Sequence, residues 1–419
     1  MSAPTISELL AERVDGRHRG FGAVAAGLAV GDLGAQGYDL ARGDLPLPLL
    51  VLRGPALAHN LEVMHGWCAR HGVALAPHGK TSMAPQLIAR QLQAGAWGMT
   101  AATVQQVAVM RAAGARRVIL ANELVDRADI GWLARERAAG PAFEVLVLVD
   151  SVAGVAALEA GLAAAGDAPP LPVLVELGGT RAGCRTDAAA VEVAAAVAAS
   201  PRVALAGVEG YEGTLGADRE PATLRAVDAF LDRMAALAAR LDADGRFDGA
   251  PEILLTAGGS SLFDRVAGRL AAVAGLSRPV RVVLRSGCYL THDDGQYART
   301  SPLTRELRPA LELWARVLSC PEPGLAICGF GKRDAPYDLD LPVPREVRRD
   351  GARPTPVAGL AVAALNDQHA FVRDPAGALR VGDVLVSGIS HPCTAFDKWS
   401  LIPVVDEHDR VVDAVRTLF

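Results

Sequence analysis

Short apolar runs alternate with longer alanine-rich segments through the middle of the chain. The runs are rich in Val, Ile and Leu, and the segments that follow carry apolar residues at helical spacing. Such alternation is typical of consecutive strand–helix units and a parallel sheet. Eight strands are predicted, at 73–76, 98–100, 117–121, 144–149, 172–177, 203–209, 252–256 and 280–285. Eight units over roughly 215 residues favour a closed (β/α)8 barrel over an open doubly wound sheet.

The pattern changes after about residue 300, where strands are separated by turns instead of helices. Five such strands are predicted, at 311–319, 324–329, 357–366, 382–386 and 411–417, with a polar loop between Leu341 and Pro356. Residues 1–44 predict a leading helix and a loop, followed by a strand at 49–53 and a helix at 56–71. We therefore expect an N-terminal segment (1–54) that contributes to a β-domain, a barrel (55–300) and a mainly antiparallel C-terminal β-domain (301–419).

Composition and charge indicate a globular enzyme. Of 419 residues, 51% are hydrophobic and 21% charged, and the net charge of -5 comes without a basic block. These values argue against nucleic acid or an anionic membrane as a partner. The six cysteines lack paired spacing, which favours reduced thiols. No signal-peptide pattern or run of roughly 20 apolar residues is visible, so a cytoplasmic protein is expected.

Lys80 follows the first predicted barrel strand in the segment Pro77-His78-Gly79-Lys80-Thr81. A helix is expected to begin at Pro85, so the lysine lies at a strand-to-helix turn. A lysine that forms a Schiff base needs a rigid strand end and partial desolvation. Lys80 is therefore the candidate for such a role, although a solvated surface lysine would fit the local pattern too.

Glycine-containing turns follow the seventh and eighth predicted strands, where barrels commonly bind phosphate. The first turn includes Gly258, Gly259 and Ser260, and the second runs from Gly287 through Cys288 to Tyr289. Backbone N–H groups in both turns, with a helix N-terminus after the first, suit a phosphate group. A plain tight turn is the alternative for each.

Two further strand ends carry candidate polar groups. Arg181 follows the strand at 172–177 and would point over the barrel mouth toward a cofactor or substrate carboxylate. Tyr211 follows the strand at 203–209 and is a candidate for stacking on a cofactor ring or donating a hydrogen bond. An ordinary surface role stays open for both.

His391 and Cys393 lie two residues apart in a turn after a predicted strand. An imidazole and a thiolate on one side of a turn suit zinc better than magnesium or calcium. Two protein ligands would leave positions for water and substrate, as a catalytic metal requires.

These motifs together resemble the D-serine dehydratase and D-threonine aldolase group of pyridoxal-phosphate enzymes, which have an alanine-racemase-like (fold-type III) barrel. The resemblance covers nearly the whole chain and includes Pro-His-x-Lys-Thr at Lys80 and His-Pro-Cys-Thr-x-Phe-Asp-Lys-Trp from His391. It implies that His78 and Lys80 contact pyridoxal phosphate. It also implies a homodimer. At 366–370 the family more often has Glu-Glu-His-Gly, so only His369 matches; it is a candidate catalytic residue or a packed histidine.

The resemblance implies a zinc-assisted lyase that removes water from a D-β-hydroxy amino acid such as D-serine, giving keto acid and ammonia. Lys80 would hold the cofactor and then take the α-proton. D-threonine aldolases place aspartate at the position of Cys393, which disfavours the alternative of retro-aldol cleavage. An amino-acid racemase would leave the His-x-Cys turn without a role. A non-catalytic pyridoxal-phosphate carrier would lack the β-domain.

Overall fold

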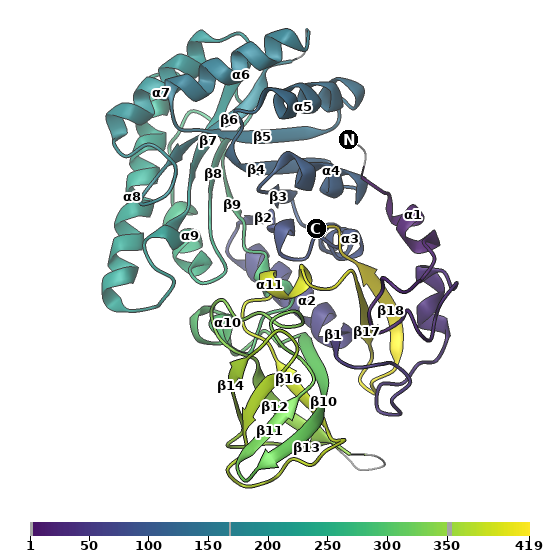
Figure 1. Ribbon diagram of the computed structural model, residues 1–419. Helices are drawn as coiled ribbons and strands as arrows, with labels where there is room; N and C mark the ends of the chain where they lie inside the picture. The colour runs from purple at the N-terminus through teal and green to yellow at the C-terminus, as the bar shows by residue number, and fades with distance from the viewer. Residues whose placement is uncertain (1–2, 167–168, 350–353) are drawn as a thin grey trace.

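An eight-stranded parallel sheet curls into a barrel in this computed structural model, which describes residues 3–166, 169–349 and 354–419 (Figure 1). The strand order is β2-β9-β8-β7-β6-β5-β4-β3. Its edges meet through hydrogen bonds from the Trp97 N–H to the Leu75 oxygen (2.8 Å) and from the Thr100 N–H to the Pro77 oxygen (2.9 Å). The predicted barrel is therefore confirmed as a nearly closed one. The strands are β2 (Ala74–Leu75), β3 (Met99–Ala101), β4 (Arg117–Glu123), β5 (Glu144–Val149), β6 (Leu171–Leu177), β7 (Val203–Gly210), β8 (Ile253–Ala257) and β9 (Val280–Leu284).

Helices surround the barrel and follow its strands in sequence. Several begin at side-chain caps: Thr103, Asp126, Ser151 and Thr186 each accept a hydrogen bond from a backbone N–H of the first turn. Three others have proline at one of their first two positions, where the missing N–H leaves no donor without an acceptor. The helices are α2 (Gly54–Arg70), α3 (Pro85–Gln93), α4 (Val104–Ala112), α5 (Arg127–Ala139), α6 (Val152–Ala164), α7 (Asp187–Ala199), α8 (Pro221–Ala243) and α9 (Phe263–Leu270).

The barrel interior changes from apolar to polar along its axis. Ile119, Leu146 and Leu174 belong to a buried apolar cluster inside the barrel. Nearer the carboxyl ends, Glu176 of β6 pairs in register with Glu209 of β7, and Glu209 pairs with Thr256 of β8. Polar side chains thus line up across three neighbouring strands at the barrel mouth, where barrel enzymes place their sites.

The second sheet belongs to the β-domain and combines both ends of the chain. β1 pairs antiparallel with β10 and parallel with β17, so the early strand predicted at 49–53 does join the C-terminal strands. The remaining pairs of this sheet are antiparallel, as expected. The strands are β1 (Leu49–Arg53), β10 (Leu311–Glu322), β11 (Leu325–Cys328), β12 (Val343–Arg348), β13 (Thr355–Pro356), β14 (Ala361–Leu365), β15 (Ala370–Arg373), β16 (Val384–Gly388), β17 (Leu401–Val405) and β18 (Val411–Arg416).

The predicted polar loop between Leu341 and Pro356 is wrong in part, because it contains strand β12; residues 350–353 lie outside the described residues. Pro344 and two arginines leave this segment without the apolar pattern of a strand, so the sequence did not indicate one. The strand forms by pairing with β16. β17 was also not predicted, because Pro403 interrupts an otherwise apolar run. The three-part division of the chain stays a prediction in its boundaries.

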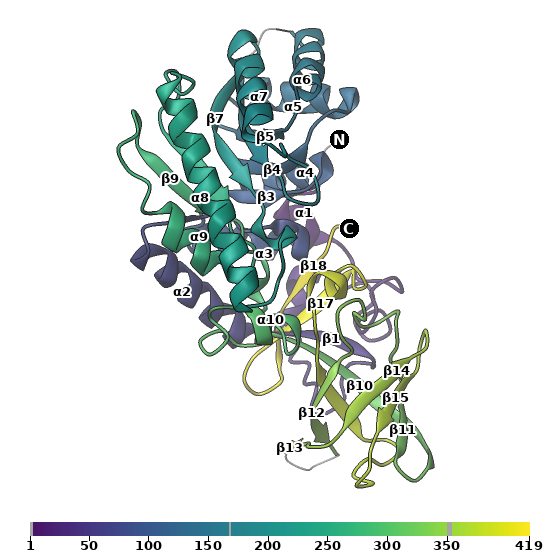
Figure 2. The same ribbon diagram turned by 90° about the vertical axis from the view of Figure 1, so that its left-hand side faces the viewer.

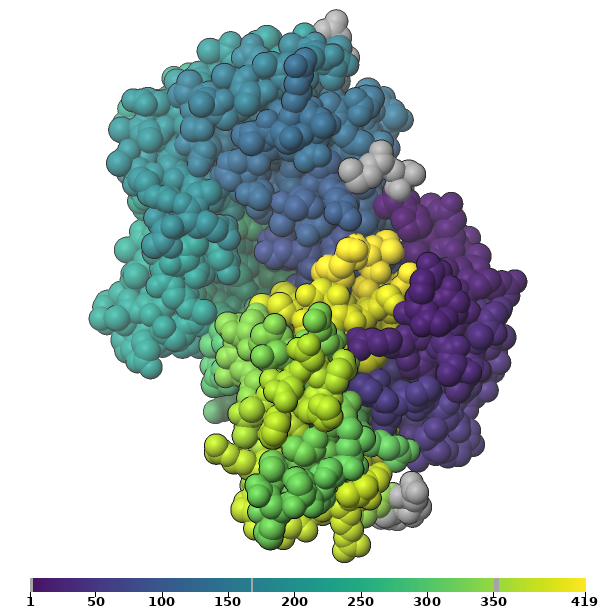
Figure 3. Space-filling view, viewed as in Figure 1, coloured from purple at the N-terminus to yellow at the C-terminus, as the bar shows by residue number. Residues whose placement is uncertain are grey.

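Short helical segments lie outside the two sheets and the helices around the barrel: α1 (Ile6–Ala11), α10 (Gln296–Thr300), α11 (Cys393–Phe396), and the 3-10 turns η1 (Val30–Ala35), η2 (Gly79–Thr81), η3 (Glu212–Thr214) and η4 (Cys288–Leu290). Of these, η4 and α10 lie between the last barrel strand and β10 and so connect the two sheets. α11 lies where the barrel meets the β-domain (Figure 1). In the turned view, the strands β10, β11, β14 and β15 lie below the barrel (Figure 2). The yellow C-terminal segment lies between barrel and N-terminal segment in the space-filling view (Figure 3). No helix in the described ranges is long and apolar enough to cross a membrane.

Candidate active site

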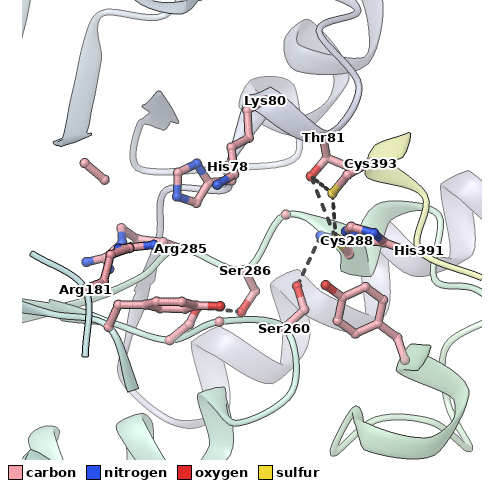
Figure 4. Close-up of a pocket in the computed structure, with 16 residues that line it drawn as sticks. His78, Lys80, Thr81, Arg181, Ser260, Arg285, Ser286, Cys288, His391 and Cys393 are labelled. Carbon is pink, nitrogen blue, oxygen red and sulfur yellow. Dashed lines mark hydrogen bonds between the residues drawn. The ribbon is translucent and has the colours of Figure 1, made fainter. Parts of the chain in front are cut away.

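Lys80 extends into a cavity at the barrel mouth, from the 3-10 turn η2 that follows β2 (Figure 4). The chain has three lysines, and of these only Lys80 lines this cavity; the others are Lys332 and Lys398. The residue is exposed, whereas a partly desolvated lysine was expected. The difference arises because the side chain projects into the open cavity and not into the barrel core. Lys80 is thus the only primary amine of a side chain that this cavity offers.

His78 precedes Lys80 and is held by the neighbouring strand end. Its backbone N–H donates to the Arg285 oxygen (3.1 Å), and its Nδ1 is buried with no hydrogen-bond partner among the described residues. Burial lowers the pKa of His78 well below its usual value, and the positive charges of Lys80, Arg285 and Arg181 lower it further. His78 therefore carries no charge at neutral pH, and its buried Nδ1 has no partner among the described residues.

Arg285 is a cavity residue that we did not predict from the sequence. It is buried, forms an ion pair with Glu209, and donates to Thr256 Oγ1 (3.1 Å) and the Gly210 oxygen (3.1 Å). Its neighbours are fixed by strand register, so the guanidinium is rigidly placed at the cavity floor. The signal in the sequence was its position at the end of the eighth barrel strand, where polar residues are functional candidates.

Glu176 and Glu209, near the carboxyl ends of β6 and β7, have an unusual protonation pattern. Burial raises the pKa of Glu176 to about 10, and a hydrogen bond with Glu123 and the charge of Glu209 add to the shift. Burial also raises the pKa of Glu209, while the guanidinium of Arg285 opposes that shift. Glu176 is therefore a neutral acid at pH 7, and Glu209 is the carboxylate that balances Arg285.

Arg181 and Tyr211 form the opposite side of the cavity, as the sequence predicted for their position. The Arg181 guanidinium carbon lies 5.1 Å from the centre of the Tyr211 ring. Among the described residues, no carboxylate lies within ion-pair distance of Arg181, which is exposed. Burial raises the pKa of Tyr211, so its hydroxyl stays protonated. Arg181 thus leaves its charge available to an anion that enters the cavity.

The two glycine-containing turns also reach the cavity, but their hydrogen bonds differ from expectation. The N–H groups of Gly258 and Gly259 donate to the Glu212 carboxylate (2.9 and 2.6 Å), and the Cys288 N–H donates to Ser260 Oγ (3.2 Å). These three N–H groups are therefore not free to bind phosphate. The sequence did not reveal this, because Glu212 comes from the 3-10 turn η3 on another loop.

The N–H groups of Ser260 and Gly287 remain available, since neither donates to an acceptor in the described part of the chain. Both residues line the cavity. Gly287 must be glycine, because a Cβ there would lie 2.5 Å from the His78 oxygen. A phosphate would therefore rely on these two N–H groups.

His391 is held at the cavity by carboxylates. Its Nδ1 lies 2.5 Å from Asp338 Oδ2, and its backbone N–H donates to Asp293 Oδ2 (3.0 Å). Burial raises the pKa of Asp338, but hydrogen bonds from Thr394 and His391 outweigh that effect and leave the pKa below its usual value. The backbone of His391 has a φ of 61°, a strained conformation that non-glycine residues rarely adopt. This arrangement fixes the ring and leaves Nε2 as the free nitrogen, as in many metal-binding histidines.

Cys393 lies beside His391 and contacts a second cysteine. Its Sγ lies 3.7 Å from Cys288 Sγ and 3.4 Å from Thr81 Oγ1 (Figure 4). The hydrogen bond from Cys288 lowers the pKa of the Cys393 thiol, and Thr81 and the charge of Lys80 lower it further. The same bond raises the pKa of Cys288 well above its usual value. Cys393 is therefore the sulfur that more readily becomes a thiolate.

Tyr297 is another cavity residue that we did not predict from the sequence. Tyr297 of α10 lines the cavity near the thiol of Cys288. Burial raises the pKa of Tyr297 well above its usual value, and the neighbouring cysteines raise it further. Its hydroxyl therefore keeps its proton at neutral pH. The sequence offered no signal, because Tyr297 follows the last barrel strand in a short helix that was not predicted.

Two predicted site residues do not reach the cavity. Tyr289 points into the protein, where its hydroxyl accepts a hydrogen bond from Gln91 Nε2 (3.2 Å). His369 is exposed in the turn that joins β14 to β15, where its carbonyl accepts the Asn366 N–H (2.9 Å). The structure thus brings neither side chain to the site within one chain.

The chain is similar to known proteins over nearly its whole length. Two family models match: "Alanine racemase, N-terminal domain" over residues 53–250 and "Putative serine dehydratase domain" over residues 310–405. A D-threonine aldolase from Arthrobacter sp is 30% identical over 402 residues, covering 94% of this chain and 96% of the relative. A 3-hydroxy-D-aspartate aldolase from Paracoccus denitrificans (strain Pd 1222) is 28% identical, covering 87% and 91%. The crystal structure of D-threonine aldolase from Filomicrobium marinum superposes with a TM-score of 0.75 at 26% identity, covering 91% and 96%.

Proposed function

Since the chain belongs to the alanine-racemase-like family of D-serine dehydratases and D-threonine aldolases, we propose that it is a pyridoxal-phosphate-dependent, zinc-assisted dehydratase of a D-β-hydroxy amino acid such as D-serine. The products would be a keto acid and ammonia. One observation carries the proposal: Lys80 and the His391–Cys393 pair come from distant parts of the sequence and line one cavity.

The barrel side of this cavity fits pyridoxal phosphate. Lys80 provides the amine that would attach it, Arg181 provides an unpaired guanidinium, and the N–H groups of Ser260 and Gly287 suit the phosphate. When bound, the cofactor supplies a ring that withdraws electrons from the substrate Cα. Lys80 Nζ would be the base that takes the proton from Cα.

The other side of the cavity fits a zinc ion. Cys393 is the sulfur that more readily loses its proton, and Asp338 orients the His391 ring. The described ranges contain no group of three or more His, Cys, Asp or Glu side chains that could hold a metal, so the site would use the two predicted ligands. Zinc there would supply a Lewis acid for the substrate β-hydroxyl.

The protonated hydroxyl of Tyr297 supports water loss over carbon–carbon cleavage. Elimination needs a proton for the departing hydroxide, whereas retro-aldol cleavage needs a base for the β-hydroxyl proton. Tyr297 lines the cavity and retains its proton at neutral pH because of burial. An acid on this side of the cavity therefore favours dehydration.

Retro-aldol cleavage of D-threonine or 3-hydroxyaspartate is the second candidate. It is favoured by the names of the relatives, a D-threonine aldolase and a 3-hydroxy-D-aspartate aldolase. The soft Cys393 in place of the aspartate expected for an aldolase argues for dehydration instead. The homodimer that the resemblance implies is part of the same proposal.

Product analysis separates the two candidates. The purified protein, loaded with pyridoxal phosphate and zinc, is incubated with D-serine, D-threonine and D-threo-3-hydroxyaspartate in turn. Ammonia and keto acid are expected as the main products, and they should disappear on chelation and return with zinc. Glycine and an aldehyde, formed faster than ammonia, would show that the aldolase alternative is correct.

A further inference from the structure

Cys288 and Cys393 are unlike the other cysteines of the chain, because their sulfurs face each other in the cavity. The Sγ atoms are 3.7 Å apart, and Thr81 Oγ1 contacts both, at 3.7 and 3.4 Å (Figure 4). No other two cysteine sulfurs in the described ranges lie within hydrogen-bond distance. Both residues line the cavity, so a small reagent can reach the pair from solvent.

We propose that Cys288 and Cys393 form a reversible disulfide when the protein meets a hydroperoxide. The sulfurs must approach by less than 2 Å, because a disulfide bond is about 2.05 Å long. Cys393 is half-buried and Cys288 buried, so Cys393 reacts first. The bond would join residues 105 positions apart, one at the barrel end and one in the α11 turn.

The chemistry balances with one hydroperoxide as the oxidant. With hydrogen peroxide, the Cys393 sulfur attacks one peroxide oxygen, the O–O bond breaks, and the displaced hydroxide takes the Cys393 thiol proton and leaves as water. The Cys288 sulfur then attacks the sulfur of the resulting sulfenic acid; the S–S bond forms, the S–O bond breaks, and the displaced hydroxide takes the Cys288 thiol proton and leaves as a second water. Two electrons pass from the two sulfurs to the peroxide, and an added dithiol returns them.

The disulfide would inhibit the activity proposed for this cavity. It removes the thiol that the proposed zinc site needs and ties the α11 turn to η4, next to the Thr81 hydroxyl that contacts both sulfurs. Formation of the bond itself does not depend on the lyase activity. A failure of the proposed function would leave this inference intact, and the reverse also holds.

Peptide mapping under non-reducing conditions tests the inference. The full-length protein is treated with a small excess of hydrogen peroxide, alkylated, digested and analysed by mass spectrometry. Two of the six thiols should disappear, a peptide pair joined through Cys288 and Cys393 should appear, and dithiothreitol should remove the link. A link between Cys320 and Cys328 alone, or oxidation of Cys393 to sulfinic acid without any link, would overturn the proposal.

Cysteine variants distinguish oxidation of the Cys288–Cys393 pair from general oxidation of the thiols. Cys320→Ser removes an exposed cysteine outside the cavity and should keep the Cys288–Cys393 link. Cys288→Ser should lose the link and accumulate sulfenic acid at Cys393, which dimedone traps. If Cys393 in that variant stays unreacted under the conditions that oxidise the native protein, Cys393 is not the first sulfur to react and the proposal fails.

Discussion

The two sides of the cavity differ in origin and in chemistry. The barrel side carries positive charge and free backbone N–H groups, from Lys80, Arg181, Ser260 and Gly287. The C-terminal side carries an imidazole and a thiol that carboxylates and a second cysteine hold in place, at His391 and Cys393. The first set suits an anionic cofactor and the second a soft metal. The difference suggests a division of work, in which the barrel binds and activates the substrate and the C-terminal turn acts on its β-hydroxyl.

Removing the amine of the barrel side should have the largest effect. Lys80→Ala should lower the rate of ammonia release by about 1,000-fold or more, because no other cavity lysine can take the α-proton. Lys332→Ala, at an exposed position outside the cavity, is the matched control. Steady-state assays with D-serine would measure both. A drop of less than tenfold in Lys80→Ala would disprove its assigned role.

Removing the thiol of the C-terminal side should be the next largest effect. Cys393→Ala should lower zinc content and reduce keto-acid formation by about 100-fold. Loss of a side chain that only hydrogen-bonds a metal ligand already lowers metal affinity or activity by about 10-fold to 100-fold, and Cys393 would be a ligand itself. Cys393→Asp should instead favour magnesium or manganese. Metal analysis and the D-serine assay on the same preparations would check this. Full zinc content in Cys393→Ala would show that the Cys393 sulfur is not a zinc ligand.

Asp338 tests whether orientation of His391 matters. Asp338→Asn loses the charged contact to Nδ1 and should weaken zinc binding by about 10-fold to 100-fold. Asp397→Asn, an exposed carboxylate in the same segment, should leave the zinc affinity unchanged. Competition with a metal indicator gives the affinities. Equal affinities in the two variants would show that the Asp338 contact is only structural.

The smallest effect concerns the buried Glu176 near the carboxyl end of β6. Its pKa rises from about 4.5 to about 10 on folding, so the folded chain binds one more proton between these values. The free energy of unfolding should therefore fall as pH rises through that window. In Glu176→Gln the slope of this decrease with pH should be smaller by about 1 kcal/mol per pH unit. Urea unfolding at pH 6 and pH 9 measures it, with exposed Glu407→Gln as the control. An unchanged slope would mean that Glu176 is ionised.

The sequence allowed more of the barrel to be predicted than of the β-domain. Period and length identified all eight barrel strands, and because the carboxyl ends of parallel strands meet, Lys80, Arg181 and Ser260 could be expected in one place. Strand β12 depends on pairing with β16 and has no apolar alternation of its own. The Glu212 contacts to Gly258 and Gly259 join separate loops, so no local pattern could indicate them. His391 and Cys393 were found through a resemblance, whereas the neighbouring Cys288 sulfur is visible only in three dimensions.

The division between the two sides of the cavity is tested most directly by borohydride reduction followed by peptide mapping. Native protein and Cys393→Ala are each loaded with pyridoxal phosphate, reduced, and mapped over the three lysines. The pyridoxyl label is expected on Lys80 in both proteins and to the same extent, because attachment belongs to the barrel side alone. Label on Lys332 or Lys398, or loss of the Lys80 label in Cys393→Ala, would contradict the account.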